Sequence, residues 1–238
     1  MHPNRNSIDD KITRFVVKLS GSLFFSKDFE KVAKALKDII SKKKDIQLIL
    51  VAGGGKTARE YIDVASKFGT DQASLDEIGI QASRLNAMAL IAALGSISCP
   101  RVPTTLSEVV HALESPKNRA VVLGGLHPGQ STNAVAALVA EKVRARRFIN
   151  ATDIEAVYTE NPKRSKSAMP LAQVTTKELE KILAGESMKA GGYDLMDPIA
   201  LKLIERSKIP TLITKCSPET LSESILEDKS QGTVILFS

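Results

Sequence analysis

The chain has 238 residues, of which 43% are hydrophobic, 25% are charged and only 4% are aromatic. This length and apolar content allow a sizeable core, in one large α/β domain or two small ones, and exclude a disordered protein. The net charge of +6 would suit nucleic acid, but the few aromatic residues provide no platform for stacked bases. The basic clusters fall at the ends of expected helices, where cations complement the helix dipole. We therefore expect no nucleic-acid partner, and the remaining interpretation is a basic surface that attracts anionic small molecules.

The expected compartment is the cytoplasm. No apolar run in the sequence approaches the roughly 18 residues that a membrane span needs, so no membrane partner is expected. The first residues, MHPNRNSIDDK, lack the apolar segment of a signal peptide. Cys99 and Cys216 stand apart without the spacing of metal ligands, so we expect neither a disulfide framework nor a zinc site.

Short apolar runs alternate with helical patterns along the whole chain. In chain order, strands are expected at 15–19, 47–52, 119–124, 146–152, 211–215 and 232–236. Helices are expected at 29–39, from about 57, at 75–94, after the turn at 124–132, near 176–184, at 197–207 and from 217. This alternation predicts an α/β fold, a three-layer αβα sandwich with a mainly parallel central sheet.

Three glycine-rich turns each follow an expected strand: SGS at 20–22, GGG at 53–55 and GGLHPGQST at 124–132. The carboxyl ends of parallel strands share one edge of the sheet, so the three turns would meet in one crevice. Lys18 interrupts the apolar strand before the first turn, and Arg59 lies one helical turn after the second. Backbone N–H groups, a lysine and an arginine together favour a ligand with several phosphates, or two phosphorylated ligands. The alternative for Lys18 is an edge-strand lysine whose ammonium reaches water.

The second turn does not match the better-known phosphate motifs. GGGKT resembles the end of a Walker A loop, but Leu50 occupies the position of its first glycine. The G-x-G-x-x-A pattern that starts at Gly53 matches a dinucleotide fingerprint, but no strand precedes the acidic candidates Asp71 and Asp76. The three glycine turns with Lys18 and Arg59 therefore favour phosphoryl transfer without a P-loop. In such a reaction cations and N–H donors stabilise the transferred group, and the acceptor's own oxygen attacks.

Six segments resemble a known family in their order and spacing. They are KLSGS, VAGGGKTAR, GIQASRLNAMAL, GGLHPGQSTNAVAALVAE, NATDIEAVYTENP and KAGGYDLMDPIALKLIERS. Together they resemble the archaeal type of uridylate (UMP) kinase, in the amino-acid kinase superfamily, over nearly all of the chain after an N-terminal extension at 1–12. The resemblance implies transfer of the γ-phosphate of ATP to UMP, with Mg²⁺ held through the ATP phosphates rather than at a protein metal site. It also implies a homohexamer and a single amino-acid kinase-like domain, in which 13–147 binds the acceptor and 148–238 binds ATP.

The resemblance further implies roles for individual residues. Lys18 and Arg59 would be catalytic, and Lys18 would stabilise the transferred group. The residues that bind ATP would be Lys18, Gly21, Ser22, Gly55, Arg59, Thr152, Asp153, Tyr158 and Asn161. The residues that bind UMP would be Gly54, Asp76, Leu126, His127, Pro128, Gly129, Gln130, Ser131 and Thr132. Asp76 would hold the ribose, and its alternative role is a carboxylate at a helix end.

The chain departs from the family at several positions. Relatives often carry V-D-G-V-Y where this chain has 154–158, so Ala156 replaces the turn glycine, and Asn161 stands in place of an aspartate. A neutral amide still hydrogen-bonds a ribose hydroxyl, but the effect on ATP affinity stays open. Asn133 occupies the position of an aspartate that orients lysines in many superfamily members, and we do not expect it to be catalytic. Asp197, which a proline follows, is predicted to cap a helix.

Two other functions compete with this prediction. Isopentenyl phosphate kinase, in the same superfamily, is expected to use a histidine early in its acceptor region. The histidines here are His2, His111 and His127, and none lies between the first two glycine turns or just after the second. His127 either contacts the ligand or only ends the strand. A non-catalytic nucleotide binder on the same fold is disfavoured because both Lys18 and Arg59 are present.

Overall fold

A seven-stranded sheet runs through the protein in the order β3-β2-β1-β4-β8-β9-β7. The computed structural model describes residues 12–162, 165–187 and 195–238. The strands are β1 (Thr13–Leu19), β2 (Ile46–Ala52), β3 (Ala120–Leu123), β4 (Arg147–Thr152), β7 (Gln173–Thr175), β8 (Thr211–Lys215) and β9 (Thr233–Leu236). Neighbours are parallel from β3 to β8, and β9 runs antiparallel to β8. The predicted, mainly parallel sheet is confirmed.

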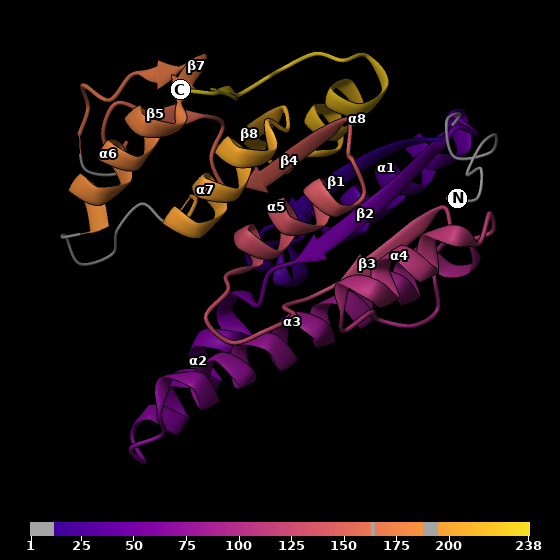
Figure 1. Ribbon diagram of the computed structural model, residues 1–238, viewed down its shortest axis with the longest axis horizontal. Helices are drawn as coiled ribbons and strands as arrows, with labels where there is room; N and C mark the ends of the chain where they lie inside the picture. Colours follow the sequence, from indigo (N-terminus) through magenta and orange to yellow (C-terminus); the bar gives the residue numbers. More distant parts are fainter. Residues whose placement is uncertain (1–11, 163–164, 188–194) are drawn as a thin grey trace, which may run out of the picture.

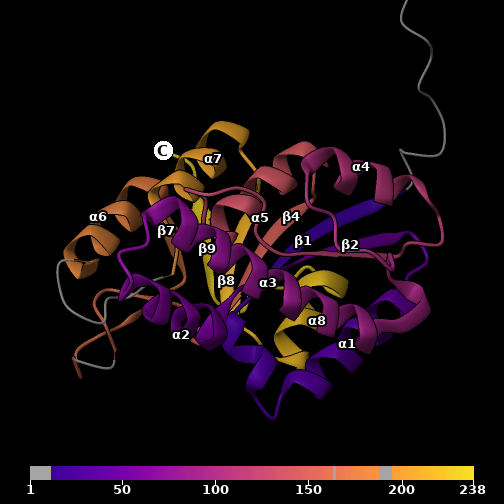
Figure 2. The ribbon, with the colours of Figure 1, turned by 90° about the horizontal axis from the view of Figure 1, so that it is seen from below.

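Helices cover both faces of the sheet, so the three-layer sandwich is also confirmed (Figures 1 and 2). One face carries α1 (Phe29–Lys42), α3 (Gln72–Leu94) and α8 (Pro218–Leu226). The other carries α4 (Leu106–Glu114), α5 (Thr132–Lys142) and α7 (Pro198–Ser207), with α6 (Thr176–Ser187) beside α7. The helix α2 (Gly55–Ser66) packs along α3, away from the sheet (Figure 1).

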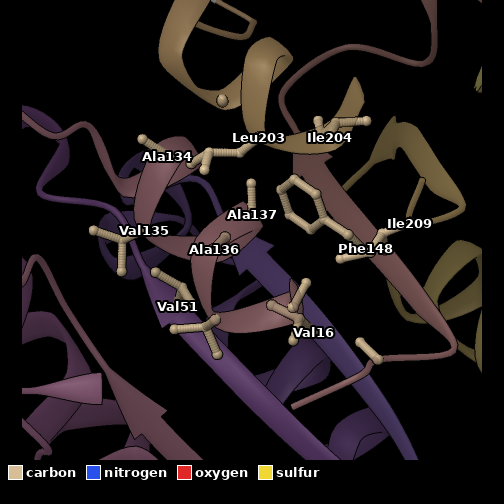
Figure 3. Packing of buried hydrophobic residues seen from close by; sticks show 14 of the residues in the cluster. Val16, Val51, Ala134, Val135, Ala136, Ala137, Phe148, Leu203, Ile204 and Ile209 are labelled. Atoms are coloured by element: carbon tan, nitrogen blue, oxygen red, sulfur yellow. The ribbon is translucent and has the colours of Figure 1, made fainter. Parts of the chain in front are cut away.

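The alanine-rich helix α5 lies in the middle of one core. Ala134, Ala136 and Ala137 are almost fully buried between the strands and α7, beside Phe148 of β4 (Figure 3). Their small side chains let the helix approach the sheet closely while larger neighbours fill the remaining space at interior packing density. This close approach fixes the amino end of α5, where the third glycine turn arrives.

The helix α3 meets the length and composition of a membrane span. The segment Gln72–Ile97 has a mean hydropathy of 1.3, with 39% of its apolar window buried in the protein. From the sequence we expected no segment of this length and apolar composition, and on that point the expectation was wrong. A single helix of this kind is weak evidence of a membrane span, because a buried core helix of a soluble protein can have the same length and apolar composition. The packing of Ala87, Leu90 and Leu94 against the sheet accounts for part of its apolar character.

Several short elements have no counterpart in the sequence prediction. They are α4, the small β5 (Val157–Tyr158) and β6 (Pro170–Leu171) hairpin, the edge strand β7, and the 3-10 turns η2 (Gly21–Phe25) and η3 (Gly95–Ile97). The proposed division at 147 falls inside one continuous sheet, because β1 pairs with β2 on one side and with β4 on the other. The predicted N-terminal extension lies outside the described residues except for residue 12, and so does much of the segment KAGGYDLMD.

Candidate active site

The first two glycine turns touch each other through their backbones. The Gly53 N–H donates to the carbonyl of Leu19 at 3.0 Å. A Cβ atom on Gly21 would lie 2.1 Å from the backbone nitrogen of Gly55, and one on Gly55 would lie 2.4 Å from the Gly21 oxygen. Gly55 also has a φ of +64°, a conformation that side chains rarely adopt. Only glycine allows this approach, so the turns after β1 and β2 form one unit.

Lys18 and the first turn face the end of β4. In the sheet Lys18 lies between Val51 and Asn150, and it is half-buried. The hydroxyl of Ser22 donates to the Asp153 carboxylate at 2.5 Å. The structure thus brings together Lys18, Ser22 and Asp153, three of the residues predicted to bind ATP.

The pKa of the Cys216 thiol is affected by burial and by the charges of Asp153 and Lys18 at the carboxyl ends of the strands. Burial raises its pKa to about 12; the charge of Asp153 adds to the rise and that of Lys18 opposes it. Lys18 and Asp153 therefore both lie within electrostatic reach of the thiol. Because only a thiolate is reactive, the raised pKa keeps Cys216 inert, as expected of a core residue.

The third turn is held by Asp76 and by helix caps. The Gly129 N–H donates to the Asp76 carboxylate at 2.7 Å. Ser131 caps α5 by accepting from the N–H groups of Asn133 and Ala134, at 3.1 and 3.0 Å. Its hydroxyl also donates to Asp197. The turn predicted to bind UMP is thereby attached to α3 at one end and to α7 at the other.

Asp76 is not the residue that caps α3. Asp71 has that role, because its carboxylate accepts from the Ser74 N–H at 3.0 Å. The hydrogen bond from the Ser74 hydroxyl, at 2.7 Å, and that from the Ser74 N–H lower the pKa of Asp71. The alternative of Asp76 as a helix-end carboxylate is therefore wrong. Asp197 does cap α7, with the N–H groups of Ile199 and Ala200 at 3.0 Å, as the sequence predicts.

The remaining ATP-side residues follow β4. Thr152 closes the next turn, because its hydroxyl accepts from the Ile154 N–H at 3.2 Å. Among the described residues the non-glycine positions with positive φ are Arg144, Lys208 and Asp228. Ala156 is not one of them, so the loss of the family's glycine causes no backbone strain. Tyr158 lies half-buried on the β5–β6 hairpin and Asn161 is buried just beyond it.

Arg59 and His127 are both exposed. Arg59 lies in the first turns of α2, four residues after Gly55, and His127 lies in the third turn. Asn133 is buried, and its amide donates to the Leu195 carbonyl at 3.3 Å. Asn133 thus has a structural hydrogen bond, in keeping with the expectation that it is not catalytic.

A cavity of about 480 Å³ lies near this edge of the sheet but is lined by none of the predicted site residues. Its walls come from the turn after β4, from β6, from the end of β8 and from the start of α8, and they include Ala156, Leu171, Thr214 and Thr220. The Thr152 hydroxyl donates to the Thr214 carbonyl at 3.3 Å, so the cavity is a direct neighbour of the predicted ATP site.

Three polar side chains of α3 were missed by the sequence prediction. Ser83, Arg84 and Asn86 hydrogen-bond the backbones of the second and third glycine turns. The available signal was the segment SRLN inside the family segment GIQASRLNAMAL. Without the fold, that pattern cannot be distinguished from ordinary solvent-facing polar positions.

This arrangement defines a class of protein. A mainly parallel sheet with three glycine turns at the carboxyl ends of its strands, next to a lysine and an arginine, is a scaffold for phosphorylated ligands. A model of the amino acid kinase family matches residues 13–215, and the chain belongs to that family.

Similar proteins share most of the chain's length. The uridylate kinase of Sulfurisphaera tokodaii is 39% identical over 226 residues, which cover 93% of this chain and 98% of that relative. The crystal structure of uridylate kinase from Archaeoglobus fulgidus has a TM-score of 0.82 and 36% identity, and the match covers 93% of this chain and 99% of that one. UMP kinase from Ureaplasma parvum, at 22% identity and a TM-score of 0.73, shares the fold.

Proposed function

We propose that this protein transfers the γ-phosphate of ATP to UMP, giving UDP and ADP. The observation that carries the proposal is the backbone contact between the turns at Gly21 and Gly55. Through this contact the first turn, which is predicted to bind the ATP phosphates, lies directly against the second turn, in which Gly54 is predicted to bind UMP and Gly55 to bind ATP. The similarity to uridylate kinases over 93% of the chain supports the choice of UMP.

The chemistry requires positioning and charge stabilisation rather than a protein nucleophile. The attacking atom is an oxygen of the UMP phosphate, which is already ionised at neutral pH, so no general base is needed. Lys18, half-buried at the end of β1, stabilises the negative charge on the transferred group. Arg59 supplies a two-pronged donor to the phosphate oxygens from the start of α2. Backbone N–H groups of Gly21 and Ser22 hold the ATP side, and that of Gly55 lies between the donor and acceptor phosphates.

The acceptor side offers polar groups suited to a nucleotide. The Oε1 atom of Gln130 is buried and has no hydrogen-bond partner within the described residues. An unsatisfied buried acceptor is costly, and a shift of the third turn when UMP binds would let this oxygen accept from the ring N–H of uracil. Asp76 binds the ribose hydroxyls in this proposal, and Gly54 and the backbone from 126 to 132 surround the phosphate and the base.

Magnesium fits this site as a companion of ATP. No group of three or more His, Cys, Asp or Glu side chains able to hold a metal occurs among the described residues. Mg²⁺ commonly binds through one or two carboxylates and the substrate phosphates, and Asp153, beside Ser22, is the carboxylate placed to assist. When bound, the ion neutralises charge on the ATP phosphates.

Two features oppose an isopentenyl phosphate kinase. His111 pairs with Glu114 on α4, at 3.0 Å, and His127 lies in the third turn, so neither takes the early acceptor position expected of such a kinase. We place the protein in the cytoplasm and in pyrimidine nucleotide synthesis, because its proposed substrates are free nucleotides.

The deciding experiment measures ADP release from ATP and Mg²⁺ with four acceptors: UMP, CMP, isopentenyl phosphate and acetylglutamate. We expect UMP to give the highest kcat/KM by a wide margin. Turnover of another acceptor in preference to UMP would replace this function. Tight nucleotide binding without turnover of any acceptor would favour the non-catalytic binder.

We also propose that the protein assembles into a homohexamer through the outer face of α2 and α3. Large apolar side chains are exposed there: Tyr61, Val64, Phe68, Leu85 and Met88. Gln81, Leu85, Met88 and Ala92 follow one another at helical spacing along the exposed side of α3. An apolar stripe of this kind indicates an interaction site, and a second copy of the chain matches it with an identical stripe.

Light scattering after size-exclusion chromatography tests the assembly. We expect the wild type at six times the chain mass of 25.7 kDa and a smaller species for the double variant Leu85→Glu, Met88→Glu. Met169→Glu is the control, because Met169 is equally exposed but lies away from α3. A monomeric wild type contradicts the proposal, and an intact hexamer in the double variant contradicts the chosen face.

A further inference from the structure

We propose that Asn86, with Ser83 and Arg84, positions the two acceptor-side glycine turns. This inference rests on the proposed function and assigns roles to residues of α3 that contact no reacting atom. All three side chains leave α3 and bond to backbone groups of other segments. The turns after β2 and β3 are thereby fixed to a single helix.

Asn86 holds the second turn by two carbonyl groups. Its Nδ2 donates to the Gly53 oxygen at 2.8 Å and to the Gly54 oxygen at 3.3 Å, and the side chain is 5% exposed. In a trans peptide the N–H points away from the carbonyl, and no cis peptide occurs among the described residues. Drawing these two carbonyls towards α3 therefore directs the N–H groups of Gly54 and Gly55 to the opposite side.

That opposite side is where the phosphates are expected. The Gly55 nitrogen lies against Gly21 of the first turn, so its N–H faces the boundary between the two proposed substrates. A free N–H in that place is a donor to phosphate oxygen. Asn86 thus orients the donors without touching the ligand.

Ser83 and Arg84 hold the third turn in the same way. The Ser83 hydroxyl accepts from the Gly125 N–H at 2.7 Å and donates to the Ile80 carbonyl at 2.6 Å. The Arg84 guanidinium donates to the carbonyls of Gly125 and Leu126, at 3.1 and 3.4 Å. Its hydrogen bonds thus go to backbone oxygens, which leaves the N–H groups of Leu126 and His127 directed away from α3.

The close seating of this turn requires glycine. A Cβ atom on Gly124 would lie 2.5 Å from the hydroxyl oxygen of Ser83 and 2.6 Å from the backbone nitrogen of Arg84. Because Ser83, Arg84 and Asn86 share one turn of one helix, α3 links the two acceptor turns, in addition to the pairing of β2 with β3 that precedes them.

The variants Asn86→Asp and Ser83→Ala test this role. Aspartate has the shape of asparagine but offers no N–H donors when ionised, and it places a negative charge against two carbonyl oxygens. Loss of positioning lowers kcat/KM for UMP by about 100-fold, while KM for ATP stays within a factor of about two. Ser83→Ala, a milder change, gives a smaller loss with the same pattern. Gln72→Ala, at an exposed position of the same helix outside the apolar stripe of α3, is the control and stays at the wild-type value.

The measurements are kcat, KM for each substrate, UMP affinity by calorimetry, and the melting temperature. A fall in kcat/KM for UMP with KM for ATP nearly unchanged supports the proposal. Equal losses for UMP and ATP, or a lower melting temperature with unchanged kinetics, would mean that the three residues only stabilise the fold, and would overturn it. The wild type is assayed alongside the variants. If it phosphorylates UMP, the proposed function holds even when the positioning role of the three residues fails.

Discussion

The substitution Gly21→Ala tests the contact on which the site depends. The added Cβ would lie 2.1 Å from the Gly55 nitrogen, 2.4 Å from its Cα and 2.8 Å from the Gly53 oxygen. All three are backbone atoms, so no flexible side chain can move aside. Ordinary contact distance requires the turns to separate by roughly 1 Å, and a misplacement of that size costs about 100-fold in rate. Overpacking a well-packed site also costs about 1–3 kcal/mol of stability.

Steady-state kinetics with ATP and UMP, together with thermal unfolding, measure both effects. We expect kcat to fall by about 100-fold and the melting temperature to fall by several degrees. Gly95→Ala is the matched control: Gly95 has a φ of +68° and nothing within 4 Å of an added Cβ. With its ψ of −140° Gly95 lies close to a region that only glycine adopts readily, so Gly95→Ala should lose roughly 1–3 kcal/mol of stability through backbone strain and keep its activity. A Gly21→Ala protein with wild-type kcat would refute the close approach of the two turns.

Three further predictions concern single side chains. Lys18→Ala should lower kcat by about 100- to 1,000-fold while leaving UMP affinity nearly unchanged; equal losses in kcat and affinity would make Lys18 structural. Asp76→Asn keeps an acceptor for the Gly129 N–H but removes the charge, so KM for UMP should rise roughly tenfold with KM for ATP unchanged; a rise in KM for ATP instead would contradict the ribose assignment. Hydrogen bonds from Lys208, Thr176 and the Ser238 N–H lower the pKa of Glu205 from 4.5 to about 2, so its stabilisation is complete above pH 4.5 and is lost as the pH falls towards 2. Melting temperatures of Glu205→Gln and the wild type should therefore differ at pH 7 and converge below pH 4.5, and a constant difference would contradict the assigned pKa.

The positions of the central strands along the chain were predictable because burial on both faces leaves a clear signal. Runs such as QLILVA are apolar throughout, and every residue of β2 is buried. The β5–β6 hairpin and β7 gave no such signal, since they have only two or three residues and lie at the margin of the sheet. The antiparallel direction of β9 was also hidden, because apolar periodicity does not record strand direction.

The candidate site was predictable to the extent that it consists of backbone turns at strand ends. Glycine, a lysine within a strand and an arginine after a helix start are visible in the sequence, and parallel topology brings them to one edge. The hydrogen bond between Ser22 and Asp153 joins residues that are 131 positions apart in the sequence. No local pattern predicts such a contact, and only the family resemblance pointed to both residues. The third turn was assigned to the acceptor, but its attachment to α3 through Gly124 and Gly125 depends on distances that no spacing encodes.

Two departures from the family pattern, Ala156 and Asn161, lie on the ATP side, and the structure gives each a local explanation. Ala156 sits in a turn closed by the Thr152 hydroxyl, in a backbone conformation that does not require glycine. Asn161 is buried, so a neutral amide there avoids the cost of burying a charged carboxylate. The acceptor side keeps the features that the family resemblance implies, from Asp76 to the third turn. The substitutions at Ala156 and Asn161 leave the contact between Gly21 and Gly55 untouched. The ATP affinity of this chain can therefore change without displacing the acceptor turn. We expect any such change to appear in KM for ATP before it appears in kcat.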